Sequence, residues 1–401
     1  MKTSVPDNFE DTEIAFHYKS NIAVRKAYMI FSILNHPWIS AMGTGVVTFA
    51  LKLRLPVESI IRRTVFDLFC GGESVEETKE AVERLGKHQV HTILDYSVEG
   101  EDSERGFDHV MNETLRTIEK ALTSPFIPFS VFKVTGLGQA SLLEKVQLKA
   151  QLTGDEMQAY QRVRGRVETI CNKAHNLKIP VLIDAEESWI QDPIDQLADE
   201  MMARFNLDQT IVFNTYQLYR SAGLQNLKDA YQLARKGNYT LGAKVVRGAY
   251  MEKERERAMA KAYPSPIHPD KDATDNAFND ALKFCISHLE KIAVMCGSHN
   301  EYSNRFLASL MNDVGLRTSD QRIWFAQLYG MSDNISFNLA NQGYNVAKYL
   351  PYGPVRAVMP YLLRRAAENT SVAGQSSREL VLIKKELKRR QGKSGKSSGK
   401  Q

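Results

Sequence analysis

The chain has 401 residues, 43% of them apolar and 25% charged, which is typical of a globular protein and excludes a disordered or fibrous one. Its formal net charge is +5, but residues 384–401 hold eight basic residues and one glutamate, so the remainder sums to −2. Because the positive charge lies in a segment without aromatic residues and the body is slightly acidic, the sequence argues against nucleic acid as a partner.

The cysteines and the N-terminal segment indicate a reducing compartment. Cysteines at 70, 171, 285 and 296 are scattered and lack CxxC spacing, so we expect reduced thiols rather than a zinc ribbon or a disulfide framework. The first residues, MKTSVPDNFEDTE, fit neither a secretory signal nor a transit peptide, and we expect a cytoplasmic protein. The apolar stretch 38–51 is shorter than the roughly 18–20 residues that cross a bilayer, which favours a packed helix.

Helical patterns come first along the chain. Residues 14–70 are mainly helical, with an amphipathic segment at 22–34 and a second helix at 57–69 that ends at Cys70-Gly71-Gly72. We expect an N-terminal helical arm over residues 1–75, and a charged helix at 73–87 leads out of it.

Eight short β-rich runs then alternate with helical segments. The runs are 92–96, 129–134, 180–185, 210–215, 243–248, 292–297, 323–328 and 347–351. The helical candidates are 104–122, 155–176, 191–206, 217–236, 272–290, 301–312 and 334–342.

This alternation predicts a parallel sheet, because a parallel neighbour is reached only through a crossover connection. Eight units over a span close to the usual 250 or so residues favour a distorted (β/α)8 TIM-type barrel over residues 76–375. The competitor, an open doubly wound sheet, lacks its GxGxxG fingerprint, since Gly136-Leu137-Gly138 has no third glycine. Residues 376–401 are expected to be a disordered basic tail.

Polar residues gather where the apolar runs end, which is where a barrel of this type carries its chemistry. Lys133 and Asp184 are the most informative, because each interrupts an apolar run where a charge is costly unless it is paired or meets a ligand. The full set is Asp95, Lys133, Asp184, Asn214, Arg247, His299, Gln327 and Tyr349. Any one of them alone fits a residue that simply leaves the core for a loop.

The last helix of the barrel carries a second group, with Tyr361, Arg364, Arg365 and Glu368 on one face. Two guanidinium groups on one face suit a small carboxylate, although a solvated arginine pair and an Arg364–Glu368 ion pair fit the spacing as well. The residues alone leave two candidates open: a Schiff-base lyase with Lys133 as nucleophile, and a cofactor-dependent enzyme acting on a small carboxylate.

The same positions resemble a known family. The matching segments, in order, are TVFDLFCGGES (64–74), FSVFKVTGLG (129–138), VLIDAEES (181–188), VFNTYQLY (212–219), AKVVRGAYMEKERERA (243–258), CGSHN (296–300), FAQLYGMSD (325–333), YLPYGPV (349–355) and YLLRRAAEN (361–369). On these motifs the chain is similar to proline dehydrogenase, the flavin-dependent barrel that also forms the first catalytic unit of bifunctional proline utilisation enzymes.

The resemblance implies FAD-dependent oxidation of L-proline to 1-pyrroline-5-carboxylate, with hydride transfer from C5 to flavin N5 and electrons passed to a membrane quinone. A separate pyrroline-5-carboxylate dehydrogenase would act next. The implied proline pocket comprises Lys133, Asp184, Tyr250, Leu328, Tyr349, Tyr361, Arg364, Arg365 and, as the acid that closes the site, Glu99; of these Lys133, Asp184, Tyr349, Arg364 and Arg365 form the implied catalytic set. The implied FAD contacts are Asn214, Lys244, Val246, Arg247, Gly248, Ala249, Ser298, His299, Asn300, Gln327 and Glu368.

Two positions depart from the bifunctional pattern, since Lys244 stands where those enzymes have an arginine near N5 and Asn214 where they have a glutamine. Hydroxyproline dehydrogenase is the alternative within the family, and the retained bulk of Tyr349 favours proline. A barrel that has lost catalysis and binds a membrane or nucleic acid through its tail is a further alternative. The basic tail also suggests peripheral contact with the inner membrane.

Overall fold

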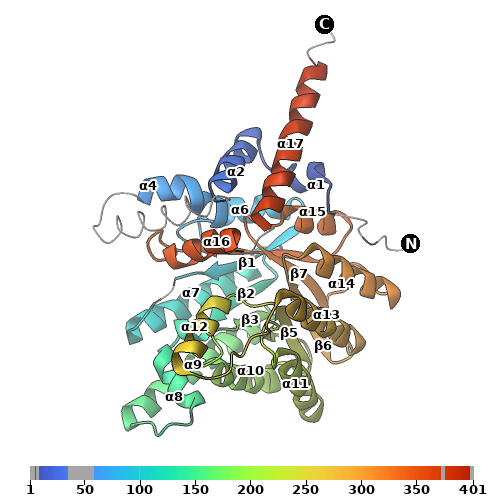
Figure 1. Cartoon of the computed structure of the whole chain (residues 1–401). Helices are drawn as coiled ribbons and strands as arrows, with labels where there is room; N and C mark the ends of the chain where they lie inside the picture. Colours follow the sequence, from blue (N-terminus) through green and yellow to red (C-terminus); the bar gives the residue numbers. More distant parts are fainter. Residues whose placement is uncertain (1–4, 6–8, 35–57, 99, 372–374, 398–401) are drawn as a thin grey trace.

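Eight parallel strands close into a barrel in the computed structural model, which describes residue 5 and residues 9–34, 58–98, 100–371 and 375–397. The strands pair in chain order and β8 closes on β1 (Figure 1). Their bounds are β1 Val90–Tyr96, β2 Phe129–Lys133, β3 Val181–Asp184, β4 Val212–Gln217, β5 Leu241–Val246, β6 Ile292–Gly297, β7 Ile323–Leu328 and β8 Val346–Tyr352. All eight predicted strands are present, and the predicted (β/α)8 architecture is confirmed.

The closing seam between β1 and β8 pairs seven residues, from Val90 with Val346 to Tyr96 with Tyr352. The next seam, between β1 and β2, pairs only two. The barrel is therefore held most extensively where its first and last strands meet.

Helices form the outer shell, as crossovers between parallel strands require. Their bounds are α6 Lys79–Gly86, α7 Glu104–Leu122, α8 Ala140–Gln147, α9 Gly154–Leu177, α10 Gln191–Phe205, α11 Gly223–Gly237, α12 Met251–Lys261, α13 Lys271–Ser287, α14 Glu301–Asp313, α15 Asp333–Asn341 and α16 Met359–Ser371, with a 3-10 turn, η2, at Val134–Gly136. Capping hydrogen bonds determine where several helices begin. Thr153, for example, exchanges hydrogen bonds with Glu156 in a capping box before α9. The helix expected from residue 217 begins at Gly223 instead, because Gln217 still belongs to β4.

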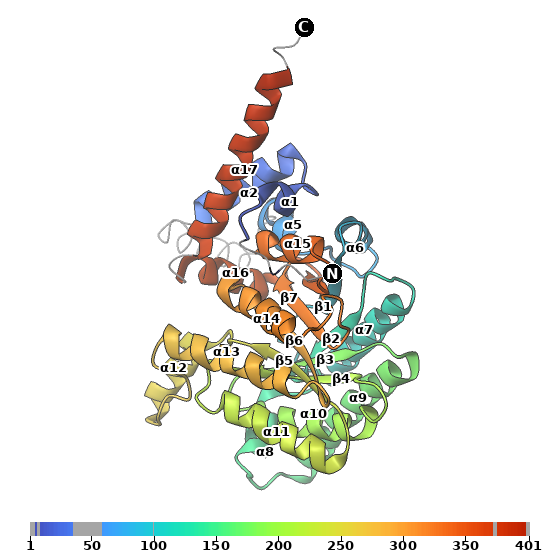
Figure 2. The same ribbon diagram turned by 90° about the vertical axis from the view of Figure 1, so that its right-hand side faces the viewer.

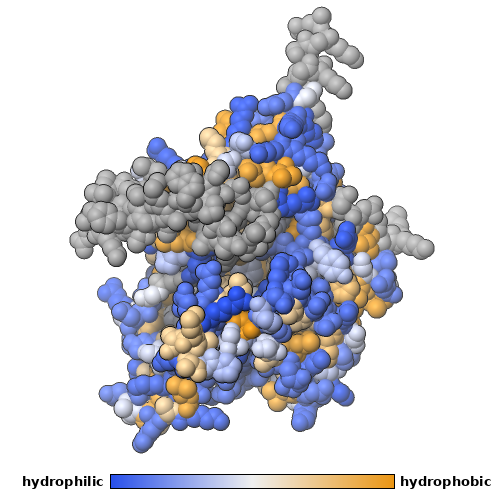
Figure 3. Space-filling model, in the orientation of Figure 1, coloured by the Kyte–Doolittle hydropathy of each residue, from blue (hydrophilic) through white to orange (hydrophobic). Residues whose placement is uncertain are grey.

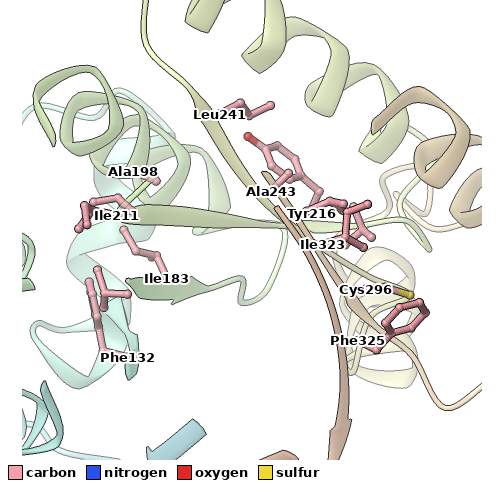
Figure 4. Packing of buried hydrophobic residues seen from close by; sticks show 14 of the residues in the cluster. Phe132, Ile183, Ala198, Ile211, Tyr216, Leu241, Ala243, Cys296, Ile323 and Phe325 are labelled. Atoms are coloured by element: carbon pink, nitrogen blue, oxygen red, sulfur yellow. The ribbon is translucent and has the colours of Figure 1, made fainter. Parts of the chain in front are cut away.

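Alternate side chains of the strands build two apolar layers. One fills the barrel and comprises Ile93, Phe129, Val131, Leu182, Phe213, Ala293, Met295, Trp324, Ala326, Ala347 and Tyr349. The other lies between strands and helices and includes Ile183, Tyr216, Leu241 and Phe325, which Figure 4 shows in place. All four cysteines are buried free thiols, as predicted.

The N-terminal arm is helical where it is described. It consists of α1 Thr12–Phe16, α2 Asn21–Leu34, α4 Glu58–Ile61, the π-helical turn η1 Arg62–Phe66 and α5 Asp67–Phe69. The apolar stretch 38–51 lies outside the described residues. Helices α1 and α2 lie on one side of the barrel next to the C-terminal helix, as both views show (Figures 1 and 2).

The C-terminal segment is not the expected disordered tail, because residues Gln375–Ser397 form the helix α17. Leu382 and Ile383 are almost completely buried in a cluster shared with α1 and α2. Glu386 is fully buried and binds Arg389 at 2.7 Å and Arg390 at 2.6 Å. The Lys-, Gly- and Ser-rich composition of the last residues hid this amphipathic segment, and four of its basic residues, Arg378, Lys385, Arg389 and Arg390, are held in ion pairs.

Polar side chains dominate the face shown in Figure 3, and apolar ones lie among them near α2 and α17. Ile22, Met29 and Ile33 on α2 are all more than half exposed. Across the described ranges, no helix combines the length and the apolar character needed to cross a bilayer.

Candidate active site

The carboxyl ends of the strands, here called the mouth of the barrel, bring together the two charges that interrupt apolar runs. Lys133 ends β2 and Asp184 ends β3, and the two residues pair directly in the parallel register. The Lys133 ammonium lies 3.5 Å from Oδ2 of Asp184. The two charges that interrupt apolar runs are therefore partners of each other.

A second lysine completes this polar centre. Lys244 of β5 contacts Oδ1 of Asp184 and donates a 2.7 Å hydrogen bond to the hydroxyl of Tyr349 on β8. That hydroxyl also lies 3.5 Å from Asp184. Burial raises the pKa of the Asp184 carboxyl, but attraction to Lys244 and Lys133 outweighs burial and leaves the pKa below its usual value. Asp184 is therefore an anion held between two cations.

Helix α16 adds the arginine pair at the mouth. Arg365 is buried, and its guanidinium carbon lies 5.3 Å from the centre of the Tyr361 ring. Burial raises the pKa of the Tyr250 hydroxyl, against the opposing effect of Lys133 and of Arg364. Arg364 thus acts on Tyr250, which precedes α12, and Arg365 packs on Tyr361 of its own helix.

Leu328, at the end of β7, joins two apolar groups. It packs against the barrel interior, which contains Tyr349, and against the cluster of α16, which contains Tyr361. Leu328 therefore links the apolar residues around Tyr349 to those around Tyr361.

Side-chain hydrogen bonds and a glycine turn fix the conformation of residues 247–249, which follow β5. Arg247 binds Asp275 at 2.7 Å, the hydroxyl of Ser298 at 2.8 Å and the hydroxyl of Ser303 at 2.9 Å. Gly248 has φ +140°, and a Cβ there would lie 2.4 Å from the Tyr219 ring. Only glycine fits this turn, which leads from Val246 to the exposed Ala249.

His299 lies after β6 as a neutral imidazole. Its Nδ1 is 2.9 Å from the hydroxyl of Ser332, and its Nε2 is 3.4 Å from the backbone nitrogen of Leu328. Burial and the nearby cations Lys348, Arg365 and Arg247 lower the pKa of His299 to about 3. Next to it, the Asn300 side chain accepts a hydrogen bond from the Ser303 backbone and caps α14.

Two residues expected to contact the cofactor point away from the mouth. Asn214 lies between the outer-layer residues Val212 and Tyr216, and its amide donates to Asp195 of α10 at 2.8 Å. Gln327 donates to the Ser298 carbonyl at 3.1 Å and also bonds Asn304 and Ser336. Both side chains face the helices, and the predicted contacts of these two residues with a flavin stay predictions.

Glu99 lies outside the described residues, as does the side chain of Glu368. The predicted closure by Glu99 and the predicted flavin contact of Glu368 therefore stay predictions.

Sequence reasoning missed the buried acid Glu186, two residues after Asp184. Its carboxylate accepts hydrogen bonds from the backbone and the hydroxyl of Thr135, and burial raises its pKa to about 7 against the effect of those bonds. The only signal was its place in the DAEES segment, where it is easily taken for a loop acid.

The family model for proline dehydrogenase matches residues 78–378 of the chain. The chain belongs to the proline dehydrogenase family. Proline dehydrogenase is an oxidoreductase acting on proline, and its activity is the first step of proline catabolism.

Relatives of the chain support the family assignment. Proline dehydrogenase 1, mitochondrial, from Dictyostelium discoideum is 33% identical, and the match covers 95% of this chain and 74% of the relative. The carbapenem antibiotics biosynthesis protein CarD of Pectobacterium carotovorum subsp. carotovorum is 36% identical, over 81% of this chain and 84% of the relative.

A solved structure shares the fold. Proline utilization A from Bdellovibrio bacteriovorus, inactivated by N-propargylglycine, superposes with a TM-score of 0.70 at 16% identity. The match covers 92% of this proline dehydrogenase and 40% of the larger protein.

Proposed function

We propose that this proline dehydrogenase oxidises L-proline to 1-pyrroline-5-carboxylate with FAD and passes the electrons to a quinone. The observation that carries the proposal is the anionic Asp184, held by Lys133 and Lys244 at the mouth of the barrel, together with the two arginines of α16. A small zwitterion with a carboxylate and a ring nitrogen matches this charge pattern.

The arginines of α16 would bind the proline carboxylate, because a guanidinium presents paired N–H donors to two oxygens. The ring nitrogen would then face Asp184, whose negative charge balances the positive charge that develops as the C5 hydrogen leaves. Leu328 and Tyr349 would pack on the ring carbons and exclude water. Fixing the substrate at both ends orients C5 for the reaction.

Lys133 is a poor nucleophile in this arrangement. Pairing with Asp184 favours the charged ammonium form, whereas a Schiff base needs the neutral amine. This supports proline oxidation over the lyase alternative and gives Lys133 the role of a polar wall residue.

The residues after β5 and β6 fit a flavin. The exposed Gly248–Ala249 turn offers backbone groups without bulky side chains, the ammonium of Lys244 is a hydrogen-bond donor, and His299 is a neutral ring. We propose that these residues hold FAD, together with Val246, Arg247, Ser298 and Asn300. Bound FAD would supply the acceptor for the hydride from C5.

The test is anaerobic titration of the purified protein with L-proline, monitored by flavin absorbance, with hydroxyproline measured in parallel. We expect a yellow protein whose absorbance bleaches with proline and changes far less with hydroxyproline. A colourless protein that does not take up FAD refutes the proposal, and stronger bleaching with hydroxyproline reassigns the substrate.

We further propose that a quinone accepts the electrons and that a separate pyrroline-5-carboxylate dehydrogenase acts on the product. The enzyme would then contact the surface of the membrane in which the quinone resides. The exposed Ile22, Met29 and Ile33 of α2 support that contact better than the tail arginines, which are already paired. Substituting Ile22 and Met29 with serine should lower binding to anionic vesicles, whereas serine at the equally exposed Met259 of α12 should not. If the wild type, the Ile22/Met29 variant and the Met259 variant bind the vesicles equally, membrane contact through α2 is refuted.

A further inference from the structure

The segment 328–333, which joins β7 to α15, contains a strained residue. Ser332 has φ 51° and ψ 42°, in the left-handed region that is unfavourable for a residue with a Cβ. Such a conformation persists only where surrounding contacts fix it, and these positions are concentrated at functional sites. The contacts of Ser332 therefore indicate what holds this segment in place.

Those contacts form a chain that runs from α17 to the mouth. The Ser332 backbone N–H donates to Oε1 of Glu379 in α17, and its hydroxyl lies 2.9 Å from Nδ1 of His299. Because Nε2 of His299 accepts from the Leu328 backbone, the imidazole proton lies on Nδ1 and is donated to Ser332. Glu379 is thus connected through Ser332 and His299 to Leu328.

The arm holds the same segment from the other side. Asp333 contacts Lys19 at 2.7 Å and accepts a 2.8 Å hydrogen bond from the Tyr18 hydroxyl. It also pairs at 2.9 Å with Lys348 of β8, which is completely buried and donates to the Met331 carbonyl at 2.6 Å. Burial alone would raise the pKa of the Asp333 carboxyl. The attraction of Lys19 and Lys348 has the larger effect and lowers the pKa, so Asp333 stays ionised.

Glu379 and Lys19 both lie outside residues 78–378, the range that the family model matches, whereas Ser332 and His299 lie inside it. Leu382 and Ile383 already dock α17 through apolar contact, so docking alone gives no reason to bury a carboxyl group at Glu379, which is 5% exposed.

We propose that Glu379 is a positioning residue, which fixes Ser332 and thereby the orientation of His299 and Leu328 towards the cofactor and the substrate. The inference rests on the proposed function, because it takes His299 as a flavin contact and Leu328 as part of the proline pocket. Burial raises the pKa of Glu379 to about 7. Both protonation states retain an oxygen that can accept from Ser332, so glutamine is the conservative replacement.

Glu386 provides a matched control. It lies seven residues further along α17 and is also buried, but it binds Arg389 and Arg390 rather than the 328–333 segment. The experiment compares the full-length wild type with the Glu379→Ala, Glu379→Gln and Glu386→Ala variants. The measurements are FAD release from the holoenzyme by fluorescence, the NMR titration of His299 between pH 5 and 8, KM and kcat for proline, and Tm.

Both alanine variants should lower Tm. Only Glu379→Ala should speed FAD release, by roughly five- to tenfold as expected for one lost buried hydrogen bond, and raise KM more than it lowers kcat. Release of Ser332 should also admit water to His299, and because burial is the largest cause of its low pKa, the imidazole should then titrate between pH 5 and 8. Glu379→Gln should behave as wild type. Unchanged FAD release and a silent His299 in Glu379→Ala, or the same changes in Glu386→Ala, would overturn the inference.

Two further comparisons keep the test decisive. If Glu379→Ala does not fold, Glu379→Asp replaces it, because this variant keeps the carboxylate but is one methylene too short to reach Ser332. Equal behaviour of the Glu379→Asp and Glu379→Gln variants would overturn the inference. If the wild type binds no FAD, the proposed function fails, and the titration of His299 in the full chain still decides whether Glu379 positions it.

Discussion

Replacing Asp184 with asparagine removes the negative charge at the mouth and keeps the shape of the side chain. Two unit charges about 4 Å apart interact by about 4 kcal/mol at an effective dielectric constant near 20. An anion at that distance from the ring nitrogen of proline therefore stabilises the transition state by about 2–4 kcal/mol, which is roughly 30- to 1000-fold in rate. The variant also leaves Lys244 without its anion, at a cost of about 3 kcal/mol in folding stability.

Stopped-flow reduction of the flavin by L-proline under anaerobic conditions measures this effect, and thermal unfolding measures the stability. Asp195→Asn is the matched control, because Asp195 is a half-buried acid, like Asp184, and bonds Asn214 and Gln191 on the outer side of the barrel. We expect reduction to slow by at least 30-fold in Asp184→Asn and by less than threefold in Asp195→Asn. A folded Asp184→Asn protein that reduces its flavin within threefold of the wild-type rate would refute the charge argument.

Three other substitutions test separate features. Gly248→Ala should lower stability by about 2–3 kcal/mol, because its Cβ meets the Tyr219 ring at a φ of +140°; an unchanged Tm would show that the turn adapts. Glu186 has a pKa raised to about 7, so its contribution to stability is complete below about pH 4.5 and is lost as the pH rises to 7. In urea titrations, the free energy of unfolding should therefore fall between pH 5 and 7 by about 2 kcal/mol less in Glu186→Gln than in the wild type. The same decrease in both proteins would contradict this. Lys133→Met should keep measurable proline-dependent dye reduction, about tenfold slower, and borohydride should trap no adduct on the wild type. Complete loss of activity in the variant together with a trapped adduct on the wild type would restore the lyase.

The strands could be predicted because buried parallel strands appear as short apolar runs bounded by polar residues. Lys133 and Asp184 were identifiable for the same reason, since a charge inside such a run needs a partner. Asn214 and Gln327 stand near the ends of predicted apolar runs too, yet both face the helices, and β4 continues past Asn214 to Gln217. Both faces of a parallel barrel strand are apolar, so the sequence carries no alternation that tells inward from outward positions.

The remaining errors concern contacts between distant segments. Glu186 and Glu379 become notable only through burial against Thr135 and Ser332, which no local pattern encodes. Helix α17 was overlooked because the composition of the final residues masked Leu382 and Ile383, and those two side chains are buried only once α1 and α2 are in place.

The long seam between β1 and β8 has a consequence for how the chain is made. The two strands are about 250 residues apart, so during synthesis β1 waits for most of the chain before its main partner exists. Until then its backbone donors and acceptors form an open edge, which favours aggregation. Pairing of two strands so far apart in the sequence is also slow, because closing the loop between them costs entropy before any stabilising contact has formed. Expression at low temperature or with chaperones should therefore raise the yield of folded enzyme, and truncation before residue 346 should abolish it.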